Sequence, residues 1–197
     1  MKIAVVAIQG NIEEHITTAE KALKEMGLPG EVIPVRHSGT IPLCDAIILP
    51  GGESTTLGRL MAREGIDGEI KEAATAGKPI MGTCAGLVLL AKDGGEQAQR
   101  TGQHLLGLMD INVDRNAFGG QRESFEVPLE VSILDSPYNA VFIRAPVITR
   151  VKSGVDVLAT FEEHIVAVKQ GNVLALAFHP ELTEDFRIHR HFFGLVQ

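Results

Sequence analysis

A cysteine bracketed by two glycines is the residue of this chain best suited to covalent chemistry. Cys84 lies in the run Gly82-Thr83-Cys84-Ala85-Gly86, between an apolar strand and a helix that should begin near Ala85. This is the spacing of a nucleophile elbow, with a thiol in place of the usual serine hydroxyl. Small neighbours permit the tight turn, and the N-terminus of the following helix favours a thiolate. The pattern predicts a nucleophile. The alternative is a buried thiol acting as a small apolar side chain, which Cys44, without such a bracket, fits well.

A thiol nucleophile needs a base, because a free thiol is only slightly ionised at neutral pH. His179 follows the apolar run Val173–Phe178, which places it at the carboxyl edge of the sheet, where α/β folds bind ligands. Glu181, two residues further on, could return to the imidazole and stabilise its protonated form. We therefore predict a triad of Cys84, His179 and Glu181. The alternative is a strand-end histidine capped by water, beside a solvated carboxylate.

The other six histidines are expected to be solvated or partly buried residues of the surface. They are His15 on the polar side of the first helix, His37, His104, His164, His189 and His191. His189 and His191 are two residues apart on the last helix and so lie on different faces, which argues against a metal pair. No metal site and no cofactor are expected.

Acyl transfer also needs donors for the developing oxyanion. The backbone N–H of Ala85 directly follows the nucleophile. The loop Pro50-Gly51-Gly52-Glu53-Ser54 follows a strand expected to lie beside the elbow, and its glycines let bare N–H groups approach a carbonyl. We expect the amides of Gly52 and Ala85 to form the oxyanion hole. An ordinary pair of loop glycines is the alternative.

Composition limits the classes of protein that this chain can belong to. It has 197 residues, 45% of them hydrophobic and 22% charged, and its net charge of −7 argues against non-specific nucleic-acid binding. No run reaches the roughly 18 apolar residues of a membrane span, and the first apolar run is too short for a signal peptide. Two distant cysteines suggest a reducing cytoplasm. One domain over residues 1–197 is expected, since no linker or repeat is visible.

The first half of the chain alternates strands and helices. The apolar run Lys2–Ile8 is typical of a strand buried on both faces. Apolar residues spaced three and four apart from Ile12 to Met26 predict a helix that ends at Gly27. Further strands are predicted at 31–35, 45–49 and 79–82, and helices at 55–63 and 66–76. This alternation predicts an α/β fold: a three-layer, flavodoxin-like sandwich with helices on both faces of a mixed, mostly parallel sheet.

The second half is richer in strands and predicts an antiparallel extension of the sheet. The expected strands are 108–115, 124–128, 130–134, 140–143, 155–160, 165–169 and 173–178, followed by a closing helix from about 183 to 196. Two segments stand outside this pattern. Gly27–Gly30 reads as an added turn, and Asp93–Leu106 is longer than a minimal connection.

The Gly-Gly loop, the cysteine elbow and the strand-end His179-Pro180-Glu181 resemble the class I glutamine amidotransferase family. Further blocks resemble its branch of pyridoxal 5′-phosphate synthase glutaminase subunits, and the resemblance runs the length of the chain. These blocks are Gln9-Gly10, Arg115-Asn116-Ala117-Phe118-Gly119, Ser124-Phe125-Glu126, Phe142-Ile143-Arg144-Ala145-Pro146 and His179-Pro180-Glu181-Leu182-Thr183-Glu184-Asp185.

The resemblance implies roles for particular residues. Cys84 is the implied nucleophile, His179 the general base and acid, and Glu181 the orienting carboxylate. The implied glutamine-binding residues are Gly52, Glu53, Ser54, Arg115, Ile143 and Arg144. A guanidinium suits the α-carboxylate of glutamine, although an arbitrary arginine is more often a surface ion-pair residue.

The implied activity is hydrolysis of L-glutamine to L-glutamate and ammonia. The implied partner is a separate barrel-shaped synthase subunit, which takes the ammonia into pyridoxal 5′-phosphate (vitamin B6) biosynthesis. Two rivals remain open. One is a glutaminase subunit of another pathway, such as imidazole glycerol phosphate synthase, which shares the triad. The other is a non-hydrolytic redox or chaperone relative of the same fold, which would leave His179 and the Gly-Gly loop without a purpose.

Overall fold

The computed structural model describes residues 1–115 and 124–196, and its first half is an alternation of strands and helices. In chain order these elements are β1 (Lys2–Val6), α1 (Ile12–Glu25), β2 (Glu31–Val35), the 3-10 turn η1 (Ile41–Leu43), β3 (Ala46–Leu49), α2 (Ser54–Glu64), α3 (Ile66–Thr75), β4 (Ile80–Thr83) and α4 (Ala85–Leu90). The bounds agree closely with the sequence predictions. Gly27, the expected stop of the first helix, has a positive φ of 66°.

The second half supplies mostly strands. In chain order the elements of this half are β5 (Ala91–Asp93), α5 (Gly95–Thr101), β6 (Met109–Asp114), β7 (Ser124–Leu129), β8 (Tyr138–Ile143), β9 (Val147–Val151), β10 (Asp156–Phe161), β11 (His164–Gln170), β12 (Val173–Leu176), the 3-10 turn η2 (Pro180–Leu182) and α6 (Arg187–Phe193). The prediction missed β5, α5 and β9. The motif predicted from Arg115 to Gly119 lies, beyond Arg115, outside the described residues.

Two predictions for this half were wrong. The strand expected at 130–134 is a turn, in which the N–H of Leu134 donates to the carbonyl of Val131. The chain must reverse there because β7 and β8 pair antiparallel. The closing helix begins at Arg187 instead of near residue 183. At the place where the first turn of this helix was expected, the hydroxyl of Thr183 instead forms a hydrogen bond with the hydroxyl of Tyr138.

One sheet joins both halves, in the order β2-β1-β3-β4-β12-β11-β9-β6-β5, with β10 beside β11. The pairs from β2 to β12 are parallel. The next pairs, β12 with β11, β11 with β9 and β9 with β6, are antiparallel. The predicted mixed α/β sheet with an antiparallel extension is confirmed. β12, which leads to His179, thus lies directly beside β4, which leads to Cys84.

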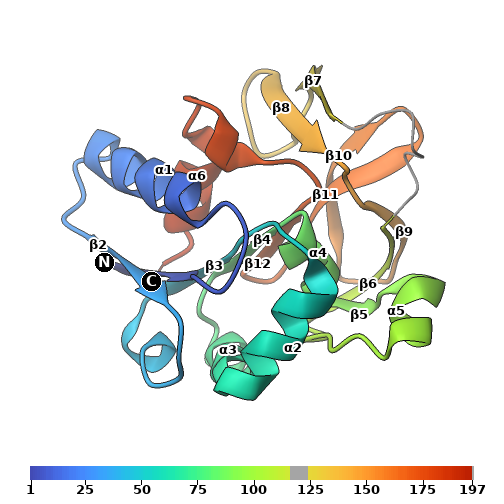
Figure 1. The fold of residues 1–197 in the computed structure, drawn as a ribbon. Helices are drawn as coiled ribbons and strands as arrows, with labels where there is room; N and C mark the ends of the chain where they lie inside the picture. The colour runs from blue at the N-terminus through green and yellow to red at the C-terminus, as the bar shows by residue number, and fades with distance from the viewer. Residues whose placement is uncertain (116–123, 197) are drawn as a thin grey trace.

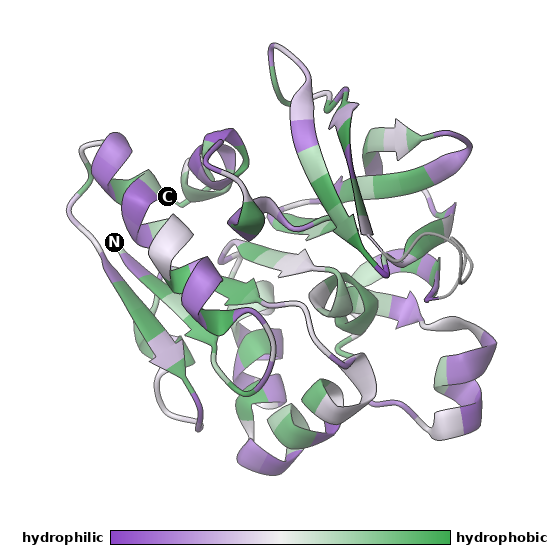
Figure 2. Cartoon of the chain, turned by 45° about the horizontal axis from the view of Figure 1, so that its top comes forward, coloured by the Kyte–Doolittle hydropathy of each residue, from purple (hydrophilic) through white to green (hydrophobic). Residues whose placement is uncertain are grey.

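Helices cover both faces of the parallel part (Figure 1). α1 and α6 lie together on one face, and α2 and α3 lie on the other. The buried strands between them are the most hydrophobic part of the ribbon, whereas the helices carry polar outer faces (Figure 2). Burial of this apolar surface is the main stabilising term of the fold. Among the residues described, no helix has the length and hydropathy needed to span a bilayer.

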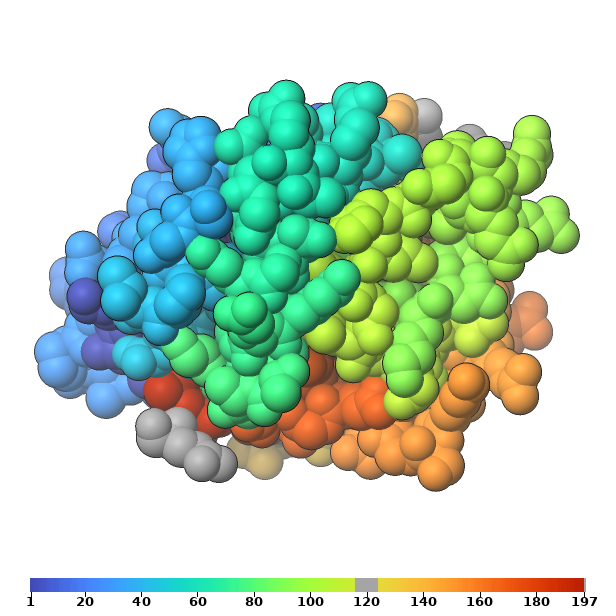
Figure 3. All heavy atoms as spheres, turned by 90° about the horizontal axis from the view of Figure 1, so that it is seen from below, coloured from blue at the N-terminus to red at the C-terminus, as the bar shows by residue number. Residues whose placement is uncertain are grey.

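The segment 93–106, longer than a minimal connection, packs against the α2–α3 layer. The imidazole of His104 lies 2.8 Å from the carboxylate of Asp67 in α3, and Leu106 N–H donates to the carbonyl of Leu89. Figure 3 shows this segment, with α5, side by side with α2 and α3 on one face of the molecule. The segment is therefore a part of the packed structure and not a loose loop.

The elbow is held by a very close approach of backbone to backbone. A Cβ built on Gly86 would lie 2.2 Å from the carbonyl oxygen of Leu49 in β3, and one on Gly82 would lie 2.7 Å from the carbonyl carbon of Gly86. Only glycine permits α4 to come this near to β3 and β4. The bracketing glycines thus set the depth of the turn that carries Cys84.

We expect Gly86→Ala to lower the free energy of unfolding by about 1–3 kcal/mol, because the added methyl overpacks against the backbone of β3. Urea denaturation followed by circular dichroism measures this change. Gly68→Ala is the matched control: it lies in α3, where an added Cβ meets nothing within 4 Å. There, alanine should stabilise the helix by about 0.5 kcal/mol. Equal effects of the two substitutions would contradict the role given to the close approach.

Candidate active site

Cys84 occupies the turn between β4 and α4 with a strained backbone. Its φ is 49° and its ψ is −102°, in a region that side-chain-bearing residues rarely adopt. Its N–H donates to the carbonyl of Leu176, the last residue of β12, at 2.8 Å, and its own carbonyl accepts from Val88 in α4. The turn is therefore tied both to the neighbouring strand and to its helix, as a nucleophile elbow requires.

His179 reaches the same place from β12. Its backbone N–H donates to the carbonyl of Val141 in β8 at 2.8 Å, so the β7–β8 hairpin helps to hold the backbone of His179 in place. Its side chain is buried, and its Nδ1 lies 2.7 Å from Oε1 of Glu181. Because Nδ1 faces the carboxylate, the opposite nitrogen, Nε2, remains for the thiol.

Gly51 borders both Cys84 and the imidazole of His179. A Cβ built on Gly51 would lie 2.9 Å from Cε1 of His179 and 3.6 Å from Cβ of Cys84. A side chain at this position would therefore meet both residues at once. A methyl group here would strike the imidazole, which explains why this loop carries glycine.

The protonation of the pair is set by burial and by charge. Burial lowers the pKa of His179, but its contacts with Cys84 and Glu181 outweigh this and raise the pKa to about 10. Burial raises the pKa of Glu181, but its histidine neighbours His15 and His179 lower it to about 2. At neutral pH the geometry thus favours an imidazolium bonded to a carboxylate. Such a cation is a proton donor for a leaving amine.

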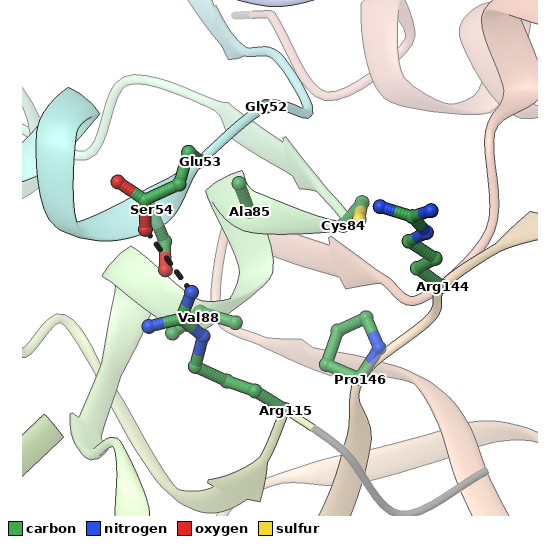
Figure 4. A pocket seen from close by; sticks show the side chains of 9 residues that line it. All are labelled: Gly52, Glu53, Ser54, Cys84, Ala85, Val88, Arg115, Arg144 and Pro146. Atoms are coloured by element: carbon green, nitrogen blue, oxygen red, sulfur yellow. Dashed lines mark hydrogen bonds and ion pairs between the residues drawn. The ribbon is translucent and has the colours of Figure 1, made fainter. Parts of the chain in front are cut away.

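A pocket of about 410 Å³ opens beside the cysteine. It is lined by Gly52, Glu53, Ser54, Cys84, Ala85, Val88, Arg115, Arg144 and Pro146. Figure 4 shows that these side chains converge from four parts of the chain and that the guanidinium of Arg144 points toward Cys84. The sequence-predicted residues Gly52, Glu53, Ser54, Ala85, Arg115 and Arg144 all line this pocket.

Glu53 and Arg115 form one side of the pocket mouth. Glu53 caps α2 by accepting hydrogen bonds from the N–H groups of Thr55 and Thr56, at 2.9 and 2.7 Å. Burial raises the pKa of Glu53, but these bonds lower it to about 2. Arg115 donates to Glu53 at 3.1 Å and to Gln103 at 3.0 Å. The carboxylate and the guanidinium are therefore held at fixed positions in the pocket that Cys84 also lines.

Ile143 contributes through its backbone. Its carbonyl lies 3.9 Å from Sγ of Cys84, close enough to accept a weak hydrogen bond from the thiol, while the residue as a whole is 37% exposed. It lies outside the residues that line the pocket. Arg144, the next residue, has a positive φ of 44°, which turns the chain toward the site.

Two of the histidine predictions were wrong. His15 and His189 are both completely buried, with an exposed fraction of 0%. The buried stripe of α1 is His15, Thr18, Ala19, Ala22 and Leu23, which is rotated from the stripe predicted through Ile12 and Ile16. The spacing of three and four residues from His15 through the two alanines was the signal that could have found it.

The structure also adds residues that the sequence did not suggest for this site. Asn11 Nδ2 donates to Oε1 of Glu181 at 3.2 Å, and the Thr18 hydroxyl donates to the backbone carbonyl of Glu181 at 3.1 Å. Gln103 supports Arg115. Their contacts span up to 170 residues of sequence, so no local pattern marks them. In the part of the chain that is described, no cluster of three or more histidine, cysteine or acidic side chains could hold a metal ion.

Comparisons with known proteins agree on one family. Residues 5–197 match the model of the SNO glutamine amidotransferase family. A relative from Methanococcoides burtonii, named pyridoxal 5′-phosphate synthase subunit PdxT, is 62% identical over 98% of this chain and 97% of its own length. One of the same name from Archaeoglobus fulgidus is 57% identical over 99% and 98%. A crystal structure described as a glutamine amidotransferase superposes with a TM-score of 0.86 at 44% identity, covering 98% of both chains.

We expect Glu181→Gln to lower the pKa of His179, because the imidazolium loses the carboxylate bonded to its Nδ1. In the unaltered chain the imidazolium should persist to about pH 10, well above its ordinary pKa of 6.5. In the variant it should lose its proton at a lower pH. A titration of ¹⁵N-labelled histidine followed by NMR measures both values.

The control is Glu184→Gln, which removes an exposed carboxylate that pairs with Lys21. Because water screens the charge of an exposed carboxylate, its effect on the buried His179–Glu181 pair is small. It should leave the titration of His179 unchanged. An unaltered His179 pKa in the Glu181→Gln chain would show that the carboxylate does not hold the imidazolium.

Proposed function

The chain belongs to the SNO glutamine amidotransferase family, and from this premise we propose that it is the glutaminase subunit of a pyridoxal 5′-phosphate synthase. The observation that carries the proposal is the strained Cys84 beside a buried His179 whose Nδ1 lies 2.7 Å from Glu181. The full-length identity to relatives named as synthase subunits supports this pathway over the imidazole glycerol phosphate alternative. A non-hydrolytic relative would have no use for the buried His–Glu pair.

The proposed reaction is hydrolysis of the side-chain amide of L-glutamine. The thiolate of Cys84 attacks the amide carbonyl and forms a tetrahedral oxyanion, which the N–H groups of Gly52 and Ala85 stabilise. The imidazolium of His179 donates its Nε2 proton to the departing nitrogen, so ammonia leaves and a γ-glutamyl thioester remains. Neutral His179 then takes a proton from water, whose oxygen attacks the thioester. The sulfur then leaves as thiolate, and His179 keeps the proton taken from water as imidazolium. The γ-carboxylic acid loses its proton to the solvent and is released as glutamate.

The pocket supports recognition of an amino acid. Glutamine carries an α-ammonium and an α-carboxylate, and both need fixed partners of opposite charge. Glu53 supplies a carboxylate that stays ionised at neutral pH, and we assign the α-ammonium to it. We assign the α-carboxylate to Arg115 and Arg144, whose guanidinium groups border the same pocket. Ser54 and the backbone of Ile143 complete the proposed substrate site.

The partner proposed for this chain is a separate barrel-shaped synthase subunit that receives ammonia. Delivery within a complex is favoured because ammonia released into water at neutral pH is protonated and loses its nucleophilicity. We further propose that residues 1–197 form a single domain, since one sheet joins both halves. We propose a cytoplasmic location, which agrees with two free cysteines, Cys44 and Cys84.

We expect Cys84→Ala to abolish ammonia release from glutamine when the synthase subunit is present, since no other group can form the thioester. Glutamate dehydrogenase coupling measures the ammonia. Cys44→Ala is the matched control, because Cys44 is buried, is not among the residues that line the pocket, and its thiol donates to the backbone carbonyl of Thr40. It should retain glutaminase activity. Retained activity in the Cys84 variant ends the proposal.

A second measurement separates the glutaminase class from a redox protein. A glutamine-like electrophile, such as a diazoketone analogue, should modify Cys84 but not Cys44, and excess glutamine should protect the thiol. Mass spectrometry of tryptic peptides reads out the modified residue. Labelling that glutamine does not reduce would contradict substrate binding in the pocket.

A further inference from the structure

His15 lies directly behind the triad carboxylate, although nothing in the proposed reaction uses it. It is fully buried, and its Nε2 lies 3.1 Å from the hydroxyl of Thr83 and 3.4 Å from Oε1 of Glu181. Thr83 is the last residue of β4 and immediately precedes Cys84. One imidazole therefore contacts both the strand that carries the nucleophile and the acid that orients the base.

The carboxylate of Glu181 is held through a single oxygen. Three nitrogens surround Oε1: Nδ1 of His179 at 2.7 Å, Nδ2 of Asn11 at 3.2 Å and Nε2 of His15 at 3.4 Å. The other oxygen, Oε2, is buried and has no hydrogen-bond partner among the described residues. Two of the three nitrogens belong to the beginning of α1. The position of the carboxylate thus depends on that helix and not only on His179.

The surroundings of His15 determine where its proton lies. Burial is the largest effect and lowers the pKa of His15. Glu181 raises this pKa, His179 lowers it further, and Glu14 on the same helix raises it. From α6, His189 also faces it, and the pKa of His189 is itself lowered to about 3, chiefly by burial. His15 is therefore neutral at working pH, with one N–H. Its Nδ1 is buried without a partner in the described part of the chain, so the geometry assigns the proton to Nε2, which faces Glu181 and Thr83.

We propose that His15 is a positioning residue of the active site: its Nε2–H holds Glu181 and Thr83 together, so that the acid and the cysteine elbow keep one relative geometry. This inference rests on the proposed glutaminase function. It differs from a space-filling role, for which the position of the polar atom would not matter. Buried polar networks of this kind fix orientation when their members are paired.

Two substitutions of His15 distinguish the positioning role from a space-filling role, because each places its N–H donor at a different ring-nitrogen position. The amide nitrogen of His15→Gln reaches the place of Nε2, whereas that of His15→Asn lies where the unpartnered Nδ1 was. Relative to the unaltered chain in complex with the synthase subunit, we expect His15→Asn to lower kcat about tenfold and leave KM for glutamine within about twofold. His15→Gln should recover most of kcat.

The control is His189→Ala, which removes the other fully buried histidine. Its two ring nitrogens have no hydrogen-bond partner among the described residues, and it packs on the ring of Phe193. This variant should lose stability with kcat unchanged. It thus reports what a packing defect beside α1 does on its own.

A readout on the free chain keeps the test independent of the proposed reaction. The Nδ1–H of His179, bonded to buried Glu181, should be visible by NMR of ¹⁵N-histidine-labelled protein and exchange slowly with water. We expect its exchange to be about tenfold faster in His15→Asn and close to unaltered in His15→Gln and His189→Ala. If the unaltered complex had no glutaminase activity but the Nδ1–H of His179 still exchanged slowly, the proposed function would be wrong, whereas the contact between His15 and Glu181 would still be supported.

The inference is overturned if His15→Asn and His15→Gln have equal kcat, or if neither alters exchange of the His179 proton. It is also overturned if His189→Ala lowers kcat as far as His15→Asn does, because packing alone would then explain the loss. A difference between the Asn and Gln variants in both readouts supports it.

Discussion

The buried carboxylate of Glu181 is the constraint on which the site depends. A carboxylate taken out of water is costly unless it is paired and hydrogen-bonded. Here the pairing comes from His179, with an Nδ1 to Oε1 distance of 2.7 Å, and further polar contacts come from His15 in α1 and from Asn11, which immediately precedes that helix. Because the charge must be matched, the imidazole takes up one orientation and keeps its proton at neutral pH. The same interaction that offsets the burial cost thereby prepares a proton donor beside the cysteine.

Sheet topology brings the remaining parts to this carboxylate. β3, β4 and β12 are adjacent and parallel, so their carboxyl ends meet at one edge. The Gly-Gly loop, the cysteine elbow and His179 follow these three ends in turn. Parallel α/β sheets bind ligands at such edges because loops there are free to carry polar groups above a rigid base. The fold thus explains why the Gly-Gly loop and His179, more than 100 positions apart in sequence, lie at one edge of the sheet with Cys84.

Local pattern was most informative where a segment is buried on both faces. The runs that became β1, β3 and β12 are short, continuous and apolar, which is typical of strands at the centre of a parallel sheet. Prediction failed where the tertiary structure overrides local preference. The 130–134 segment looks like a strand but turns, because β7 must fold back on β8. His15 looks polar within its helix, yet its side chain is buried against Glu181, 166 residues away in sequence.

The sequence by itself determined which residues are candidates for the proposed chemistry: an elbow cysteine, a strand-end histidine followed by a carboxylate, and a glycine pair each have the local spacing that the proposed role requires. Tertiary structure alone decided which further side chains support them. Asn11 and His15 contact Glu181 across the fold, and such contacts depend on helix rotation and strand order rather than on neighbouring residues. Gln103 contacts Arg115 from the segment that precedes β6. The conformation of a local turn is determined by a few neighbouring residues. Which side chains of two sequence-distant elements face each other is determined only when the whole core packs.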